Sequence, residues 1–319
     1  MTAGRRAVGG GATGQQHVAT FSGGVGSWAA ARRVAERHGT DNLTLLFTDT
    51  LIEDTDLYRF LIEAACNVFD VPAPADLVKA ALAMPEFHED EAGRVAALTD
   101  LRERTKERLP FLAWIAEGRD PWTIFFAERF LGNSRADPCS KILKRQAIDC
   151  WLAASRSSST TAVYVGIDWS EKHRFTGLRD RRLVDGWRYE APLCEPPFLT
   201  KVDIYGALRA HGIRRPRLYT LGLSHNNCGG GCIKAGQGHW VRVYHALPAV
   251  FAWWEAKEQA IREYLGKPVS ILTDRSGDGK KKPLTLADLR QRIERGAQVD
   301  MFDVGGCGCF SDDAPEAAS

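Results

Sequence analysis

The sequence predicts an α/β fold in which helices flank a mostly parallel, five-stranded sheet. Short apolar runs, which are typical of buried strands, alternate with segments of helical period. The first run ends in a glycine-rich turn that leads directly into a helix, and such strand–turn–helix units build parallel sheets. The three clearest runs are 17–21, 43–47 and 162–167, and a further short strand is expected within 187–193.

Helices are expected between and after these strands. Asp54 and Thr200 stand where a side chain can cap the start of a helix. Pro248 suits the first position of a long amphipathic segment that carries Trp253 and Trp254. The expected helices cover 28–38, 57–65, 121–131, 142–154, 200–211, 248–265 and 284–295, and most of 71–120 is expected to be helical as well.

Composition limits the class of protein. The chain has 319 residues, of which 44% are hydrophobic and 26% charged, and this excludes a wholly disordered chain. Lys and Arg number 42 against 40 Asp and Glu, so a uniformly basic, histone-like protein is excluded too. No apolar stretch reaches the roughly 18 residues of a membrane span, and the N-terminus lacks the apolar part of a secretory signal. We therefore expect a cytoplasmic protein with no membrane partner.

Four regions are expected along the chain. A flexible tail at 1–16 precedes an α/β domain at 17–220. A mainly helical extension at 221–310 carries cysteine-rich turns, and 311–319 form an acidic tail. Ligands of open α/β sheets bind at the carboxyl ends of the strands, so we expect the extension to bring its cysteines over that edge.

The glycine-rich turn over 22–27 reads SGGVGS. Glycines let several backbone N–H groups point at one centre, and the start of the following helix adds a partial positive charge. Two serine hydroxyls add donors, so the turn suits a phosphate or a pyrophosphate. A nucleoside-triphosphatase P-loop is excluded because the Gly-Lys-Ser/Thr ending is missing. On this motif alone, a tight connection without a ligand remains an open alternative.

Five segments follow one another in a characteristic order. SGGVGS at 22–27 follows the first strand, and FTDT at 47–50 ends the second. PCSKILKR occupies 138–145, GIDWSEKHR occupies 166–174, and a proline, a helix and a cysteine pair follow over 192–232. Together they resemble the PP-loop ATP pyrophosphatase superfamily, in its phosphoadenosine-phosphosulfate-reductase-like branch. The resemblance covers roughly 17–235.

The resemblance implies that the chain binds an adenine nucleotide. By the matching motif positions, the implied nucleotide-binding residues are Ser22, Gly23, Gly24, Val25, Gly26, Ser27, Asp49, Gly166 and Arg174. The family's loop has an Asp where this chain has Gly26, and ATP-cleaving members use that Asp for metal and pyrophosphate. Phosphate binding is therefore expected, while ATP cleavage is left open. Asp49, Glu53 or Asp54 are the candidate Mg²⁺ ligands, with helix capping and solvation as the alternative for the last two.

The eight cysteines fall into two groups. Cys66 and Cys150 lie in apolar helical patterns and are expected to be buried, and a structural role is favoured for Cys194. The other five stand in polar, glycine-rich turns: Cys139, Cys228, Cys232, Cys307 and Cys309. In a reducing compartment such clustering favours metal ligands or catalytic thiols over disulfides.

Relatives of the adenosine-phosphosulfate reductase type hold a [4Fe–4S] cluster with a tandem cysteine pair and a later CxxC. Here Ser140 replaces the second cysteine of the tandem. The resemblance therefore implies a cluster held by Cys139, Cys228, Cys232 and one of the two late cysteines, with Cys309 preferred over Cys307. Whichever of these two is not a ligand is the expected catalytic thiol. A Zn²⁺ site with the same ligands and a site without metal remain open.

Two further features have open interpretations. The polar segments 224–227 and 234–240 can contact a substrate base or phosphate, or can simply form turns. Basic clusters at 174–182, 214–217 and 280–282 suit phosphates or a polynucleotide backbone, or a solvated surface.

The function that the resemblance implies is an adenylating sulfurtransferase. It would use ATP and Mg²⁺ to transfer sulfur to a nucleic acid or a small metabolite, with a cysteine desulfurase as candidate sulfur donor. Two alternatives remain: a reductase of phosphoadenosine phosphosulfate or adenosine phosphosulfate, and a non-catalytic module that senses nucleotides or binds nucleic acid.

Overall fold

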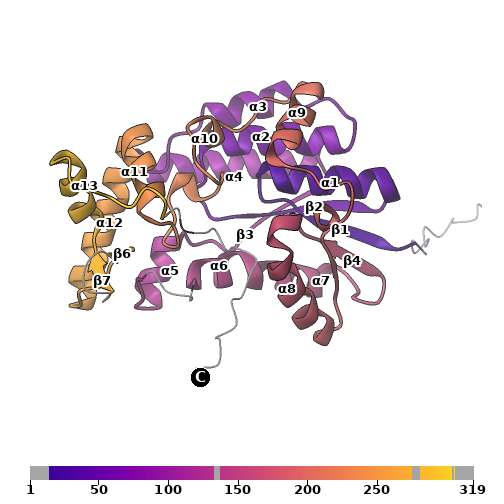
Figure 1. The fold of residues 1–319 in the computed structure, drawn as a ribbon. Helices are drawn as coiled ribbons and strands as arrows, with labels where there is room; N and C mark the ends of the chain where they lie inside the picture. Colours follow the sequence, from indigo (N-terminus) through magenta and orange to yellow (C-terminus); the bar gives the residue numbers. More distant parts are fainter. Residues whose placement is uncertain (1–13, 133–136, 275–280, 304, 306–319) are drawn as a thin grey trace, which may run out of the picture.

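The computed structural model describes residues 14–132, 137–274, 281–303 and 305. Its centre is an all-parallel, five-stranded sheet with the strand order β3-β2-β1-β4-β5 (Figure 1). The strands are β1 (Gln16–Thr20), β2 (Leu43–Asp49), β3 (Leu112–Ala116), β4 (Thr161–Tyr164) and β5 (Arg188–Glu190). The predicted α/β class, with five parallel strands between helices, is confirmed.

Alternating side chains of the central strands feed two separate cores. In β2, Leu45 and Phe47 pack on one face of the sheet, while Leu46 packs on the other. The first face is covered by α1 (Val25–His38), α2 (Thr55–Val68), α3 (Ala75–Leu82), α4 (Glu91–Arg108) and α9 (Lys201–Ala210). The second face is covered by α7 (Ala147–Ser155) and α8 (Lys172–Val184), which lie below the sheet in Figure 1.

The C-terminal part forms a third core beside the sheet. It contains α11 (Gln237–Ala246), α12 (Pro248–Leu265), α13 (Leu286–Glu294) and an antiparallel pair of short strands, β6 (Leu272–Asp274) and β7 (Lys282–Leu284). In this core the Trp254 ring contacts two others: Trp240, at a centroid distance of 5.4 Å, and Trp122 of α5 (Pro121–Ala127), at 5.0 Å. The extension is therefore mainly helical, and it shares its core with a helix that precedes β4.

Short elements connect these layers around the carboxyl edge of the sheet. They are α6 (Pro138–Ser140), η1 (Lys141–Gln146), η2 (Trp169–Glu171), η3 (Pro192–Cys194), α10 (Arg217–Thr220) and η4 (Cys228–Gly230). The helix expected over 142–154 is divided here, because a π-helical turn at 141–146 precedes α7.

Two expected caps are present. The Asp54 carboxylate accepts a hydrogen bond from the backbone N–H of Asp56 at 2.9 Å, and Thr200 forms a reciprocal capping box with Asp203. In the part of the chain that the structure describes, no helix is long and apolar enough to cross a membrane.

One cysteine expectation is wrong. Cys66 and Cys194 are buried as expected, but Cys150 is exposed. Ile148 and Leu152, four residues apart, form the buried stripe of α7. Cys150 stands halfway between them in sequence and so faces the opposite side of the helix.

Glu258 connects the parts of the C-terminal core. This α12 side chain is only 1% exposed, and its carboxylate accepts the backbone N–H groups of Ile271 at 2.7 Å and Leu286 at 2.6 Å. Burial raises the pKa of Glu258 to about 7, although both hydrogen bonds oppose the change. Because the folded-state pKa lies above the ordinary value, the stability linked to this group is present below about pH 4.5 and is lost as the pH rises through 7.

We expect the wild type to lose about 2–3 kcal/mol more unfolding free energy than Glu258→Gln between about pH 5 and pH 8. The Gln side chain cannot ionise, so the variant lacks this part of the pH dependence. Urea unfolding at the two pH values measures the difference. Glu263→Gln, an exposed position on the same helix, should keep the wild-type pH dependence. Parallel behaviour of wild type and Glu258→Gln would contradict the assignment.

Candidate functional site

A cleft of about 400 Å³ lies at the carboxyl ends of β1 and β4. These strands are neighbours in the sheet, yet the chain leaves β1 toward β2 and reaches β4 only after β3. The order of the strands therefore reverses between β1 and β4, and open α/β sheets bind their ligands at such a position. The expected place of the site at the strand ends agrees with this cleft.

Most of the predicted nucleotide-binding residues line the cleft. They are Ser22, Gly24, Gly26, Ser27, Gly166 and Arg174. Asp168, Ser170, Glu171, Lys201, Ser224, His225, Asn227 and Gly305 complete most of the wall. Gly23 and Val25 are not part of the lining: the Gly23 carbonyl oxygen accepts a hydrogen bond from Asn226, and Val25 is buried in the core.

Asp49 does not line the cleft. Its buried carboxylate accepts hydrogen bonds from the Leu51 backbone N–H at 2.8 Å, the Tyr58 hydroxyl at 2.8 Å and the Trp114 indole N–H at 3.0 Å. Burial raises the pKa of Asp49, and these three donors oppose the increase. Asp54 is also outside the cleft, since it caps α2 and pairs with Arg217 at 2.7 Å.

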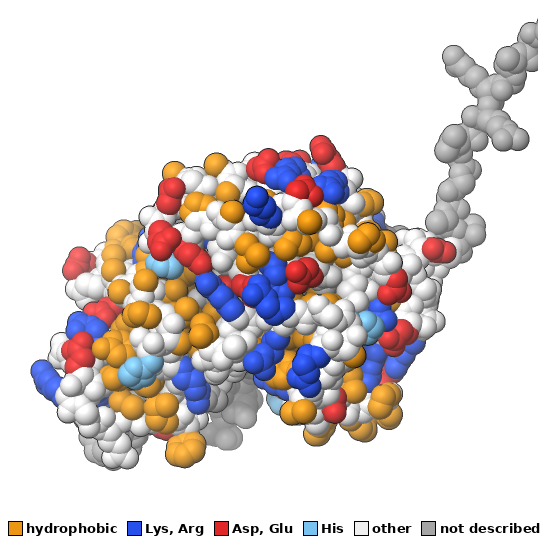
Figure 2. All heavy atoms as spheres, turned by 90° about the horizontal axis from the view of Figure 1, so that it is seen from above, with side chains coloured by type: hydrophobic (Ala, Val, Ile, Leu, Met, Phe, Trp, Pro, Cys, Tyr) orange, Lys and Arg blue, Asp and Glu red, His pale blue; other side chains and the backbone are white. Residues whose placement is uncertain are grey.

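The cleft offers groups that can bind an anion, although its two cations, Arg174 and Lys201, are matched in number by the carboxylates of Asp168 and Glu171. Helix α1 starts at its floor, and neither a capping side chain nor an acidic residue of the first turn occupies the free N–H groups there. Arg174 and Lys201 add two cations; Arg174 pairs with Glu171, and Lys201 donates to the carbonyl oxygen of Ser224 at 3.4 Å. Figure 2 shows Lys and Arg side chains gathered across the middle of the face seen from above.

Two glycines bring the loop and the end of β4 into backbone contact. A Cβ atom on Gly166 would lie 2.9 Å from both N and Cα of Ser27, closer than any real Cβ approaches. A Cβ on Gly26 would lie 3.3 Å from the carbonyl oxygen of Gly166. The Asp expected by the family pattern at position 26 would therefore need Gly166 to move by a few tenths of an ångström.

The loop before Cys228 closes the other side of the cleft. The Asn226 side chain, 1% exposed, donates to the carbonyl oxygen of Gly23 at 2.8 Å. The His225 ring stacks on that of His239 at a centroid distance of 4.9 Å, and His239 donates from Nε2 to the carbonyl oxygen of Gly230 at 2.7 Å. Burial, with the nearby His239 and Lys144, lowers the pKa of His225 to about 3, so this cleft residue is a neutral imidazole at neutral pH.

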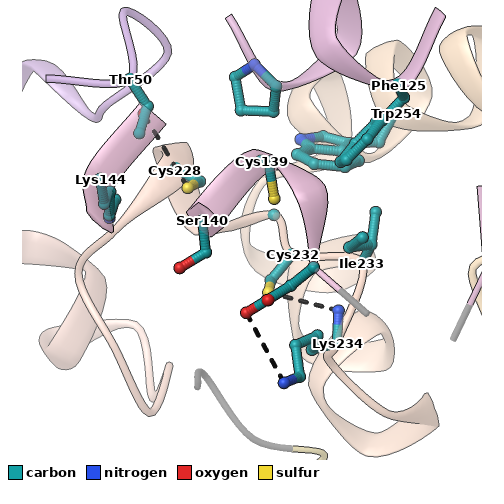
Figure 3. Close-up of a pocket in the computed structure, with 13 residues that line it drawn as sticks. Thr50, Phe125, Cys139, Ser140, Lys144, Cys228, Cys232, Ile233, Lys234 and Trp254 are labelled. Atoms are coloured by element: carbon teal, nitrogen blue, oxygen red, sulfur yellow. Dashed lines mark hydrogen bonds and ion pairs between the residues drawn. The ribbon is translucent and has the colours of Figure 1, made fainter. Parts of the chain in front are cut away.

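Three of the predicted ligands line a second, smaller pocket of about 30 Å³, which we call the thiol pocket (Figure 3). Cys139 comes from α6, while Cys228 and Cys232 flank three glycines. Phe125 and Trp254 form an apolar wall. A Cβ on Gly231 would lie 2.2 Å from the Trp254 ring, so the pair of cysteines approaches this wall only because glycine stands between them.

Polar groups surround the sulfur atoms. The backbone N–H of Lys234 donates to Cys232 Sγ at 3.4 Å, and the Thr50 hydroxyl lies 3.9 Å from Cys228 Sγ. The buried Glu53 carboxylate accepts the N–H of Cys228, whose φ of +54° is in the left-handed region. Lys144, also buried, lines the pocket with its ammonium 3.9 Å from Glu53.

The thiol pocket is not a complete metal site within the described residues. No group of three or more His, Cys, Asp or Glu side chains stands at metal-binding spacing among them. Ser140, in place of the tandem cysteine, lines the same pocket, and Cys307 and Cys309 lie outside the described residues. Gly305 pairs with Ala235 in an isolated antiparallel bridge and lines the cleft.

Sequence reasoning missed several residues of these sites. Lys201 lines the cleft but belongs to no local pattern that indicates a ligand. Ser170 also lines it and stands inside the motif over 166–174, but it is not one of the implied nucleotide-binding positions. Lys144 is part of the motif over 138–145, and only its burial reveals its place beside the thiols. No family model matches the sequence, and no curated protein matches it.

We expect Gly166→Ala to lose about 1–3 kcal/mol of unfolding free energy, because the new methyl group forces β4 away from the start of α1. Gly177→Ala is the matched control. Position 177 lies within α8, and its added methyl would meet only the end of the Arg181 side chain at 3.4 Å. This control should be as stable as the wild type or up to about 1 kcal/mol more stable. Equal urea-unfolding curves for both variants would disprove the close backbone contact.

Proposed function

We propose that the cleft binds the phosphates of an adenine nucleotide and that the chain is an adenine-nucleotide-dependent sulfur-transfer enzyme. The observation that carries the proposal is that the cleft and the thiol pocket are lined by neighbouring residues of one segment. Asn227 lines the cleft, and the next residue, Cys228, lines the thiol pocket. The two pockets thus meet at one peptide bond, and this supports the proposal that phosphates held in the cleft and the thiols act on one substrate.

Each part of the cleft has a role in this proposal. The loop over 22–27 and the N–H groups at the start of α1 hold phosphate oxygens, as helix N-termini do in many proteins. Arg174 and Lys201 balance the phosphate charge. Asp168 and Glu171 are the carboxylates that line the cleft, and they replace Asp49, Glu53 and Asp54 as candidate ligands of an accompanying Mg²⁺.

In the ATP-using reaction, an oxygen atom of the substrate attacks the α-phosphorus of ATP and pyrophosphate leaves. A sulfur nucleophile then attacks the activated carbon, and AMP departs with the oxygen. The loop over 22–27 would hold the departing pyrophosphate, and the neutral imidazole of His225 would add no charge to the cleft. The acceptor is a nucleic acid or a small metabolite, and a cysteine desulfurase is the candidate source of sulfur.

The thiol pocket supplies the ligand type of an iron–sulfur site, although its three cysteines do not stand at metal-binding spacing among the described residues. Cys139, Cys228 and Cys232 are soft thiolate ligands, and the N–H donated to Cys232 Sγ is the type of contact that tunes such clusters. When bound, a [4Fe–4S] cluster would supply electrons or sulfur next to the cleft. Cys309, or Cys307 in its place, would be the fourth ligand, and the other would be the reactive thiol. Zn²⁺ on the same thiolates is the alternative.

A phosphosulfate reductase is the second candidate, and Gly26 favours it. Such an enzyme binds phosphoadenosine phosphosulfate or adenosine phosphosulfate and has no need to cleave ATP. The narrow space between Gly26 and the Gly166 carbonyl leaves little room for the aspartate of ATP-cleaving relatives.

Nucleotide turnover separates these functions. We expect ATP and a sulfur acceptor to yield pyrophosphate; sulfite release from phosphoadenosine phosphosulfate with a thiol donor would instead identify a reductase. Arg174→Ala should weaken nucleotide binding about 10- to 100-fold, the effect of losing one charged hydrogen bond. Arg179→Ala, on the same helix but outside the cleft lining, should not. Nucleotide binding without either product would indicate a non-catalytic module, and no binding would refute the proposal.

Metal content tests the thiol pocket. We expect protein purified without oxygen to contain iron and acid-labile sulfide, and Cys139→Ser, Cys228→Ser and Cys232→Ser each to lower both. Cys150→Ser is the control, since this thiol is exposed on α7 and away from the pocket. Fewer than about two irons per chain in the wild type would disprove the cluster, and one zinc per chain would indicate a structural metal.

A further inference from the structure

Two exposed aromatic side chains stand together at the rim of the cleft. Trp169 is 44% exposed and Phe198 is 55% exposed, and their ring centroids lie 6.0 Å apart. Trp169 stands between Asp168 and Ser170, both of which line the cleft, but neither aromatic ring is part of the lining. The two rings are tilted by 54° to each other, so they present two separate aromatic surfaces beside the cleft.

Both segments that carry the pair are held in place. The indole N–H of Trp169 donates to the carbonyl oxygen of Leu199 at 3.0 Å, which joins η2 to the segment of Phe198. The largely buried Arg33 donates to the carbonyl oxygens of Pro192 at 2.8 Å and Glu195 at 3.0 Å, just before Phe198. Hydrogen bonds therefore fix the two backbone segments that carry the rings. Fixed aromatic groups that remain exposed commonly mark a binding surface.

Positive charge continues from this rim along α8. The segment 168–185 contains five Lys and Arg residues, at 172, 174, 179, 181 and 182, and four acidic residues, at 168, 171, 180 and 185. Three of the cations are ion-paired: Arg174 with Glu171, Arg179 with Asp180, and Arg182 with Asp149. The 13 residues of α8 extend about 20 Å, further than one nucleotide. Arg174 lines the cleft, whereas Arg179 and Arg181 follow it outside the lining. Arg174 and Arg181, seven residues apart, lie on the same side of α8, so two basic side chains follow one another along the helix from the cleft.

We propose that Trp169 and Phe198 each stack an unpaired base of a single-stranded nucleic acid whose backbone runs along α8. The inference rests on the proposed function of the cleft and gives its sulfur acceptor a chemical class. Aromatic faces combined with cations bind single strands, because every base has a stackable face and every nucleotide a phosphate. A mononucleotide alone would occupy the cleft and leave the rim unused. A duplex would keep its bases stacked internally.

Oligonucleotide binding tests this proposal on the full chain. The probes are fluorescein-labelled oligouridylate and oligothymidylate of about 20 nucleotides, and a duplex of the same length, with anisotropy as the readout. Trp169→Ala and Phe198→Ala should each weaken single-strand binding roughly 5- to 100-fold, the loss of one stacked base. Trp169→Phe keeps an aromatic face and should restore most of the affinity.

The controls separate this proposal from the function of the cleft. Tyr264→Ala removes an aromatic ring of α12 that is 50% exposed, and single-strand binding should not change. Adenine nucleotide affinity should be unchanged in all four variants.

Two outcomes separate the stacking proposal from the cleft assignment. If the wild type binds nucleotide but Trp169→Ala binds the single strands as tightly as the wild type does, the stacking proposal is wrong and the cleft assignment stands. If no nucleotide binds but single-strand affinity falls in Trp169→Ala, the cleft assignment is wrong instead. Duplex binding as tight as single-strand binding would also overturn the proposal.

Discussion

The hydrogen bond from the Asn226 side chain to the Gly23 carbonyl oxygen ties the C-terminal part of the chain to the glycine loop. It forms between residues 203 positions apart and is buried, so no water competes for either group. The same short segment carries His225 and Asn227 at the cleft and Cys228 at the thiol pocket. Both sites therefore depend on one loop being fixed at one point of the sheet.

The close packing of glycines makes this arrangement possible. Gly166 lets the end of β4 meet the start of α1, and Gly231 lets the loop with its two cysteines lie against Trp254. On the other side of the thiol pocket, the Glu53 carboxylate holds the N–H of Cys228, whose backbone is in a conformation that L-residues seldom adopt. Strained residues of this kind concentrate at functional sites, where surrounding contacts determine them.

Periodicity and capping predicted much of the fold because these signals are local. The long amphipathic segment from Pro248 matches α12, and Asp54 and Thr200 start their helices. The strand β3 was not predicted, since it lies in a region expected to be helical. It is an edge strand in which most residues are only partly buried, and the helix before it is rich in charged residues, so its apolar pattern is weak. Cys150 was predicted to be buried, although the spacing of Ile148 and Leu152 already places it on the opposite side of the helix.

For the candidate sites, sequence motifs located the glycine loop and three thiols. The Asn226 contact and the buried Lys144 arise from tertiary packing and have no local signature.

The adjacency of Asn227 and Cys228 has a thermodynamic consequence. The peptide bond between these two residues borders both pockets, so a ligand in either pocket contacts the same short segment. That segment is held by the hydrogen bond of Asn226 to Gly23 before it and by that of the Cys228 N–H to Glu53 after it. Any shift of that peptide on occupation of one site changes the other. Coupling of this kind is reciprocal, so whatever factor a ligand in the cleft applies to affinity in the thiol pocket, a ligand in the thiol pocket applies to affinity in the cleft.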